Sequence, residues 1–403
     1  MTPKQRADLT FKDNLRRGRH GWVRLTPAYS VKVVREILVK HPNLEYVLDP
    51  FSGTGTTGLV AGQLGRRCDL LDINPFLIWL ARAKCANYDS EQLNLARIGA
   101  AEIVTEAKSL AEDSLWFPPI SNIERWWPHS RLVVLAKVFK ALHAKFPSPC
   151  PAKDLLLVAF CRLIIQWSNA AFNHQSMSFK DDGGQLSLFA NEEDEIYQTF
   201  VNDLDSIRAA ASDPVSGGVQ AFEKDARQIT AKSKYDAVIT SPPYVNRMSY
   251  IRELRPYMYW LGYLVEARDA GELDWEAIGG TWGIATSNLS DWQPKNGQGE
   301  LPQLAPIVEE IARSSDILSK YVYKYFTDMS LHFESVYDAL VPGGHVFYVV
   351  GNSKFYDTLV PAERLYTDLM KRSGFEDTKV DVIRKRNSKK ELFEYLVSAR
   401  KPL

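Results

Sequence analysis

The sequence predicts an α/β fold in which helices cover both faces of a mostly parallel sheet. Short apolar segments alternate with segments of helical periodicity between residues 45 and 86. The apolar segments lack a polar face, which is typical of strands buried on both sides. With 403 residues, 45% of them hydrophobic, the chain is long enough for one large α/β domain with insertions or for two modest domains.

The first elements of this sheet follow one another closely. Val31, Val34, Ile37 and Leu38 recur at helical spacing, and a short apolar strand that ends at Asp49 comes next. A helix, a second strand and a further helix complete a βαβα start. In chain order we expect a helix over 27–40, a strand over 45–48, a helix over 57–64, a strand over 67–71 and a helix over 75–86.

Two insertions are expected to interrupt the sheet. Helical periodicity with many aromatic residues runs from about residue 91 to 211, which predicts a helical insertion over 91–218. A second insertion over 245–314 carries a loop signal at Gly279-Gly280. The core that bears the sheet then comprises 25–90, 219–244 and 315–403.

The later core segments complete the predicted sheet. Pro342-Gly343-Gly344 separates a long helix from an apolar strand, and two C-terminal strands joined by a basic turn predict an antiparallel hairpin at the sheet edge. We expect strands over 219–222, 235–240, 345–350, 377–384 and 392–399, and the long helix over 317–339.

Residues 1–24 are predicted to form a basic arm that is mobile or bound to a surface, because they combine little apolar periodicity with Lys12, Arg16, Arg17, Arg19 and Arg24. The formal net charge of the chain is zero, so any nucleic-acid site must come from local clustering of charge.

The composition also predicts a cytoplasmic protein with no membrane role. The most apolar stretch, 155–165, is too short to cross a bilayer, and the basic N-terminus lacks the apolar segment of a signal peptide. The four cysteines show no metal-type spacing, so neither a metal site nor a disulfide is expected.

The segment Asp49 to Gly58 predicts a cofactor site. Its glycines follow a strand and open a helix, where they allow a tight turn and close approach of the backbone to a ligand. The loop fits the dinucleotide pattern G-x-G-x-x-G, with Asp72 placed to hold ribose hydroxyls. However, Asp49 would repel a pyrophosphate and suits a cofactor that bears an ammonium and a sulfonium. This charge argument favours S-adenosylmethionine.

The roles of the strand-end acids have alternatives. Asp49 or Asp72 alone could equally cap a helix, although two such acids around one glycine loop are less easily explained by chance. A third acid, Asp225, follows the next strand and is a candidate ligand for an adenine amino group.

The tetrapeptide Ser241-Pro242-Pro243-Tyr244 predicts the catalytic loop. Its two prolines stiffen the backbone at the end of an apolar strand and leave carbonyls free to face a substrate. An exocyclic amino group is a poor nucleophile, but hydrogen bonds to the Ser241 hydroxyl and the Pro242 carbonyl would favour a pyramidal nitrogen. Positioning and electrostatics then suffice without a strong base, and Tyr244 offers a face for an extruded base.

These motifs resemble the amino-methyltransferases of DNA modification, whose marks are a D-P-F-x-G-x-G loop and a [DNS]-P-P-[YFW] tetrapeptide. Thr26 to Ser30 is similar to the segment before the glycine loop, and Asp72 to Pro75 to the second cofactor motif. Serine in the first place of the tetrapeptide is typical of the cytosine-N4 branch, with exceptions. The resemblance implies a class I S-adenosylmethionine-dependent methyltransferase fold, a mostly parallel seven-stranded Rossmann-like sheet with an antiparallel edge hairpin and helical insertions. The cofactor ligands that it implies are Thr26, Tyr29, Asp49, Phe51, Ser52, Gly53, Thr54, Gly55, Thr56, Asp72, Ile73, Asn74, Asp225 and Ala226.

The resemblance further implies double-stranded DNA as the substrate, with the target cytosine flipped out of the helix and a cognate restriction endonuclease as a candidate partner. The continuation 245–250 resembles the extension of many N4 enzymes, and the second insertion, with parts of the helical block, is the candidate target-recognition region. Instead of contacting DNA, Arg252 and Arg255 could lie on a solvated helix face, and the basic turn of the hairpin could be exposed only to solvent. The candidate DNA contacts are Arg247, Tyr250, Arg252, Arg255, Lys385, Arg386 and Lys389.

Four other functions stay open from the sequence. The same chemistry could serve adenine-N6 in DNA or a base in tRNA or rRNA, although no recognisable RNA-binding module flanks the core. A DNA-binding subunit without activity would leave the intact motifs unexplained. An NAD-dependent oxidoreductase would account for the glycine loop but not for the tetrapeptide.

Overall fold

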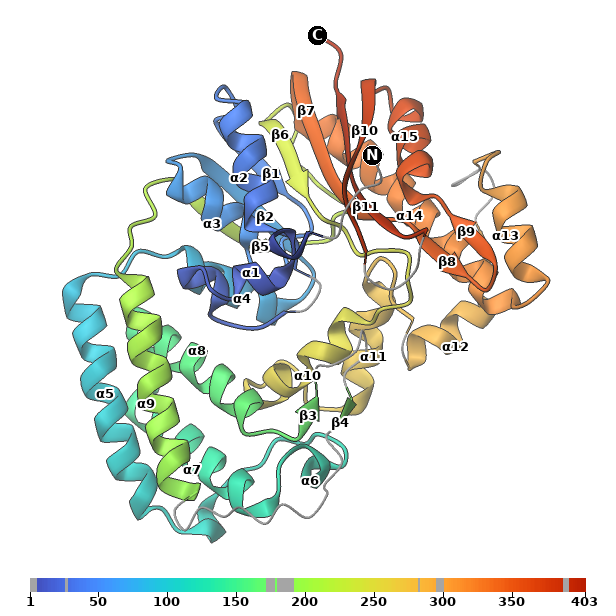
Figure 1. Cartoon of the computed structure of the whole chain (residues 1–403). Coiled ribbons are helices and arrows are strands. Elements are labelled where there is room, and N and C mark those ends of the chain that lie inside the picture. The colour runs from blue at the N-terminus through green and yellow to red at the C-terminus, as the bar shows by residue number, and fades with distance from the viewer. Residues whose placement is uncertain are drawn as a thin grey trace.

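The computed structural model describes residues 6–25, 28–171, 178–179, 192–281, 283–294, 301–386 and 391–403. Its centre is a seven-stranded sheet of order β10-β11-β7-β6-β1-β2-β5, in which β11 runs antiparallel to both of its neighbours (Figure 1). This confirms the predicted class I fold and its edge hairpin. The strands are β1 (Tyr46–Asp49), β2 (Arg67–Asp72), β5 (Val219–Glu223), β6 (Tyr235–Thr240), β7 (Leu340–Gly351), β10 (Glu376–Lys385) and β11 (Phe393–Arg400).

Both faces of the central strands are buried because they carry apolar side chains on both sides, whereas the edge strand β10 is largely exposed. Val47 and Leu70 pack in one cluster with α2 (Val31–Lys40), α3 (Thr56–Gln63) and α4 (Pro75–Cys85). Their neighbours Leu48 and Leu71 pack in a second cluster with α14 (Asp316–Ala339) and α15 (Ala362–Arg372). The strands β1 and β2 therefore have no wet face, as their composition predicts.

The strand order also fixes where a ligand can enter. The chain passes from β1 to β2 and β5 on one side, and from β6 to β7 on the other. The loops that follow β1 and β6 therefore diverge, and a crevice opens at the carboxyl ends of these two strands.

The first insertion is a helical unit at one end of the molecule (Figure 1). Trp260, from the second insertion, reaches into its core and contacts the rings of Trp116, Trp127, Phe139 and Phe160. The two insertions are thus packed together. The unit contains α5 (Ser90–Ser109), η3 (Glu112–Ser114), α6 (Ile123–Trp126), α7 (His129–Lys145), α8 (Pro151–Gln166), β3 (Ala170–Ala171), β4 (Ser178–Phe179) and α9 (Glu192–Ala211).

The second insertion is also helical, and its last two helices pack on α14. It contains α10 (Tyr250–Trp260), α11 (Ala267–Glu276), α12 (Ile284–Asp291) and α13 (Ala305–Ala312). A short hairpin of β8 (Ser353–Phe355) and β9 (Thr358–Val360) follows β7 and contacts α13. This arrangement brings α10 and α11 to the crevice.

The prediction of a mobile or surface-bound arm is wrong for residues 6–25. They form η1 (Ala7–Leu9), α1 (Phe11–Asn14) and η2 (Gly18–Gly21), and Arg19 is only 2% exposed. Its guanidinium donates to the carbonyl oxygens of Ala210 at 3.1 Å, Lys84 at 3.0 Å and Ala211 at 2.6 Å. Carbonyls at helix ends have no partner within the helix, so a buried cation can satisfy several of them at once.

Two element bounds also differ from expectation. The first helix begins at Val31 and not at residue 27, because the Ser30 hydroxyl accepts the Lys32 N–H at 3.2 Å and caps it. Strand β7 begins at Leu340 and includes the Pro-Gly-Gly segment, where Gly343 has a φ of +75°. In the described ranges, no helix is long and apolar enough to cross a membrane. The same ranges contain no group of three or more His, Cys, Asp and Glu side chains that could hold a metal ion.

Candidate active site

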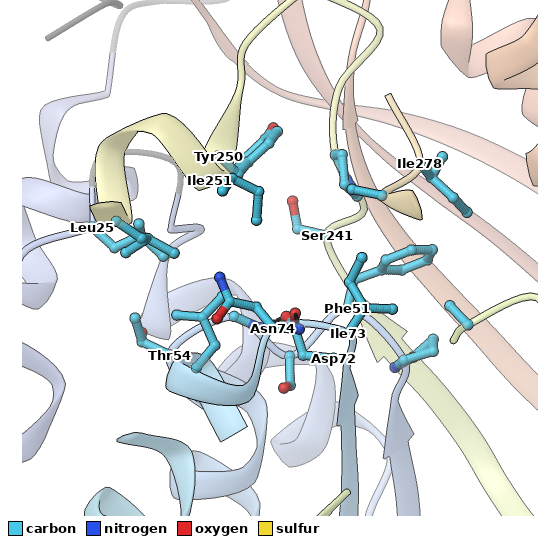
Figure 2. Close-up of a pocket in the computed structure, with 18 of the residues that line it drawn as sticks. Leu25, Phe51, Thr54, Asp72, Ile73, Asn74, Ser241, Tyr250, Ile251 and Ile278 are labelled. Atoms are coloured by element: carbon cyan, nitrogen blue, oxygen red, sulfur yellow. Dashed lines mark hydrogen bonds between the residues drawn. The ribbon is translucent and has the colours of Figure 1, made fainter. Parts of the chain in front are cut away.

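A pocket lies at the carboxyl edge of the sheet, where the loops after β1, β2 and β6 meet α10 (Figure 2). The space it encloses, including the part open to solvent, is about 940 Å³. The candidate site residues from the sequence that line this pocket are Tyr29, Phe51, Ser52, Gly53, Thr54, Thr56, Asp72, Ile73, Asn74, Asp225, Ala226, Ser241, Pro243 and Tyr250.

The glycine loop forms the floor of this pocket. Gly55 has a φ of +78°, and a Cβ there would lie 3.1 Å from the Cβ of Ala81, so the turn requires glycine. Gly55 does not itself line the pocket, but its neighbours Ser52 and Thr54 do. The Ser52 hydroxyl is buried and has no hydrogen-bond partner among the described residues. A polar ligand could supply that partner.

Asp49 lies beneath the loop and not in the pocket. It is 0% exposed, and its carboxylate accepts hydrogen bonds from the Thr240 hydroxyl at 2.6 Å, the Phe51 N–H at 3.1 Å and the Thr57 hydroxyl. Burial raises the pKa of Asp49 to about 6. The expectation that Asp49 itself faces a cationic cofactor is therefore wrong, because its oxygens already tie β1 to the glycine loop and β6.

Asp72 is the acid that reaches the pocket. Its carboxylate accepts the Gly53 N–H at 3.0 Å and the Asn74 N–H at 2.9 Å, which joins the loops after β1 and β2. Burial raises the pKa of Asp72 to about 7. The Asn74 side chain caps α4 by accepting the Phe76 N–H at 3.0 Å. A ligand hydroxyl that donates to Asp72 would find a preoriented acceptor.

Asp225 and Ala226 line the pocket after β5, and each is held by a residue that the motifs did not reveal. The Arg227 guanidinium pairs with the Asp225 carboxylate at 2.7 Å. Burial alone would raise the pKa of Asp225, but the hydrogen bonds from Arg227 bring it below its ordinary value. The carbonyl of Ala226 lies 2.8 Å from Nδ1 of the buried His332, whose ring also contacts Phe51.

The catalytic loop presents one hydroxyl to the pocket. Ser241 Oγ donates to the Val349 carbonyl at 3.0 Å, so its lone pairs stay available as acceptors. Pro243 is fixed from the other side, since its carbonyl accepts the Tyr325 hydroxyl at 2.7 Å. The Pro242 carbonyl accepts no hydrogen bond from the described residues. Pro242 itself does not line the pocket.

The two tyrosines near this loop lie differently from expectation. Tyr244 does not line the pocket, and its hydroxyl donates to Glu394 Oε1 at 3.0 Å. Tyr250, which was expected only as a DNA contact, faces the pocket near Ser241 (Figure 2). Its hydroxyl accepts the Tyr244 N–H at 3.1 Å. Tyr250, and not Tyr244, therefore supplies an aromatic ring to the pocket beside Ser241.

The candidate DNA contacts fall into two groups. Arg247 is exposed and has a φ of 60°, whereas Arg252 and Arg255 are half-buried on α10 and so do not form a fully solvated face. In the hairpin, Lys385 and Arg386 are half-buried, and the Arg386 guanidinium donates to the Asn352 carbonyl at 2.9 Å. The predicted contacts Thr26 and Lys389 lie outside the described residues.

Several pocket residues gave no signal in the sequence. Lys224, Leu254, Glu276 and Ile278 carry no motif, and the last three come from the helices and loops of the second insertion. Val349, Glu394 and His332 act on the site across long sequence separations, whereas Arg227 pairs with Asp225 only two residues away. Apolar periodicity in α10 could have indicated a buried face, but not which cavity that face lines.

Among curated proteins, the chain is similar to type II methyltransferases. No protein-family model matches the chain. The type II methyltransferase M.BsoBI of Geobacillus stearothermophilus is 21% identical over 434 residues, which span 96% of this chain and 85% of the relative. The type II methyltransferase M.AvaI of Nostoc sp. (strain PCC 7120) is 21% identical over 419 residues, which span 94% and 83%. The chain is thus similar to type II methyltransferases over nearly its whole length.

Two solved structures are weakly similar. A SAM-dependent methyltransferase from Methanosarcina mazei is 9% identical, with 91% of this chain and 97% of that chain covered and a TM-score of 0.31. The rRNA methyltransferase aviRa from Streptomyces viridochromogenes is 12% identical, with coverages of 96% and 92% and a TM-score of 0.29. The strand order of the sheet, and not these superpositions, defines the fold.

Proposed function

We propose that this protein is a type II DNA methyltransferase that transfers a methyl group from S-adenosylmethionine to the N4 amino group of a flipped cytosine. The observation that carries the proposal is the Ser241 hydroxyl. It faces the pocket with its hydrogen given to Val349, at the carboxyl edge where the glycine loop and Asp72 also lie. The similarity to M.BsoBI and M.AvaI supports DNA as the substrate and a cognate restriction endonuclease as a partner.

The pocket residues fit the cofactor. Asp72 can accept the ribose hydroxyls, and the unpaired Ser52 hydroxyl and the close backbone of Gly53 suit its amino-acid end. Asp225 and Ala226 line the same pocket and are proposed to hold the adenine ring. The bound cofactor supplies an electrophilic methyl group on a sulfonium. Thr26, from the segment before the glycine loop, is retained as a proposed ligand.

The acceptor side works by orientation. Ser241 Oγ and the Pro242 carbonyl are two acceptors on one stiff loop. Once the Pro242 carbonyl, which does not line the pocket, is reached by the substrate, the two acceptors together can hold both hydrogens of an exocyclic amino group. Two such hydrogen bonds would direct the nitrogen lone pair toward the methyl group, so that no strong base is required. The extra proton of the methylated amine is lost to water after the transfer.

Cytosine-N4 is favoured over adenine-N6 by Ser241. In the family that the motifs resemble, serine at this position is typical of the cytosine branch. A hydroxyl that donates to the backbone is an acceptor toward the substrate, as an amino group requires.

Methyl transfer with nucleoside analysis tests the proposal. Purified protein is incubated with tritiated S-adenosylmethionine and either duplex DNA from a methylation-free host or tRNA, and the digested products are identified by mass spectrometry. We expect N4-methylcytosine from DNA and no label in tRNA. N6-methyladenine would overturn the choice of base, label confined to tRNA would overturn the substrate, and no label in either would overturn methyl transfer.

A further inference from the structure

Tyr244 of the catalytic loop is held by a strand that lies 150 residues away in the sequence. Its hydroxyl donates to Glu394 Oε1 on β11 at 3.0 Å. Burial raises the pKa of Tyr244 well above its ordinary value, so the hydroxyl keeps its proton and remains a donor. This contact joins the loop after β6 to the C-terminal hairpin.

Glu394 is well suited to be the fixed end of this contact. It is 8% exposed, and the Arg384 guanidinium donates to Oε2 at 2.7 Å and to Oε1 at 3.0 Å. A bidentate pair of this kind fixes both the position and the plane of the carboxylate. It also uses the charge of Arg384, which is therefore unsuited to a phosphate contact.

The ring of Tyr244 is fixed as closely as its hydroxyl. A Cβ at Gly351, the last residue of β7, would lie 2.8 Å from ring atom Cε2, so only glycine lets the ring pack there. The Arg386 guanidinium lies 5.4 Å from the ring centroid. Tyr244 is thus located by β7 and by both strands of the hairpin.

We propose that Glu394, paired with Arg384, is a positioning residue for the methyl-transfer reaction. It holds Tyr244, and through the backbone of the loop it holds Ser241 and Pro242, in the geometry that the acceptor amine requires. The inference rests on the proposed function and adds a residue to it. It also gives the C-terminal hairpin a role in catalysis besides any contact with DNA.

We expect variants of Glu394 to lose turnover without losing affinity for S-adenosylmethionine. Glu394→Ala should lower kcat on DNA roughly tenfold, because a charge-assisted hydrogen bond that orders the loop is lost, while calorimetric binding of S-adenosylmethionine changes less than about twofold. Glu394→Gln keeps one acceptor oxygen for Tyr244 and should fall between Glu394→Ala and the wild type. Asp377→Asn is the matched control, since Asp377 pairs with Arg400 at 3.1 Å across the same two strands but does not contact Tyr244.

A double-mutant cycle separates positioning from general stability. Tyr244→Phe removes the hydroxyl that Glu394 holds and that also interacts with the Ser241 side chain, and should lower kcat at least as much as Glu394→Ala does. In the Tyr244→Phe background, Glu394→Ala should then cost less than about a further twofold in kcat. Thermal unfolding identifies any variant that fails to fold, and Tyr244→Phe alone then decides the outcome.

Two results would overturn the inference. One is additive losses in the cycle, and the other is a kcat for Tyr244→Phe equal to that of Asp377→Asn. Either result is distinct from a failure of the proposed function, in which the wild-type protein itself transfers no methyl group to DNA.

Discussion

The pocket has a proposed cofactor side, formed by the loops after β1, β2 and β5, and a proposed acceptor side, formed by the loop after β6. These two sides are built in different ways. On the cofactor side the backbone contacts of the glycine loop are local: Asp49 binds the backbone two residues on, Asp72 does the same, and the contact from Gly53 to Asp72 spans 19 residues. Two contacts beneath and beside this loop are long-range, since Asp49 accepts from Thr240 and the Ala226 carbonyl contacts His332. On the acceptor side, Ser241 contacts a residue 108 positions away, and Tyr244 one that is 150 positions away. A short segment can therefore specify the turn of the glycine loop and its contact with Asp72, whereas the predicted catalytic loop depends on the completed sheet.

This difference has a consequence for variants. A change on the cofactor side should alter binding of S-adenosylmethionine and leave the distant catalytic loop in place. A change on the acceptor side should alter turnover and leave cofactor binding intact. Each prediction below tests whether the two sides are separable in this way.

Ser241→Ala should have the largest effect. Loss of the acceptor hydroxyl should lower kcat on DNA by about a hundredfold, since a preoriented hydrogen bond to the reacting group is removed. Calorimetry should show little change in S-adenosylmethionine affinity. Ser353→Ala, which removes a buried hydroxyl outside the pocket, is the control. A large loss of cofactor affinity in Ser241→Ala would contradict the separation.

Asp72→Asn should show the opposite pattern. Removing a charged acceptor should weaken S-adenosylmethionine binding by about 1.5–3 kcal/mol, roughly ten- to a hundredfold, with a smaller effect on turnover at saturation. The pKa of Asp72 is raised to about 7, and the ionised form is the one that accepts ribose hydroxyls. Wild-type affinity should therefore fall as the pH is lowered through 7, and Asp72→Asn should lose this dependence. An unchanged wild-type affinity between pH 8 and pH 6 would refute the role.

The same contrast explains what could be predicted from the sequence. Gly53, Gly55 and Asp72 were identifiable because glycine turns and strand-end acids are local signals, and the structure brings them together. The depth of Asp49 was not predictable, since it depends on hydroxyls of Thr57 and Thr240 that only the folded sheet supplies. The burial of Arg19 escaped prediction for the same reason.

The positions of the aromatic residues show this limit most clearly. The sequence placed Tyr244 against the base and Tyr250 against DNA, yet Tyr250 lines the pocket and Tyr244 is held by Glu394. No pattern within the tetrapeptide indicates which way its tyrosine turns. The orientation of Tyr244 depends on contacts with Glu394 and Gly351, which lie on strands much further along the sequence.

Lys385→Ala should have the smallest effect, because a phosphate contact supplies affinity and no chemistry. If the hairpin tip contacts the backbone of DNA, removing one contact should reduce the slope of log affinity against log salt by about 0.9. DNA binding should then weaken only a few-fold, and kcat at saturating DNA should be unchanged. Lys379→Ala is the control, since Lys379 is on the same strand but pairs with Asp381 at 2.8 Å. Equal slopes of log affinity against log salt for Lys385→Ala and Lys379→Ala would mean that Lys385 makes no contact with DNA phosphates. A lower kcat for Lys385→Ala would instead mean that the tip, like Glu394, belongs to the acceptor side.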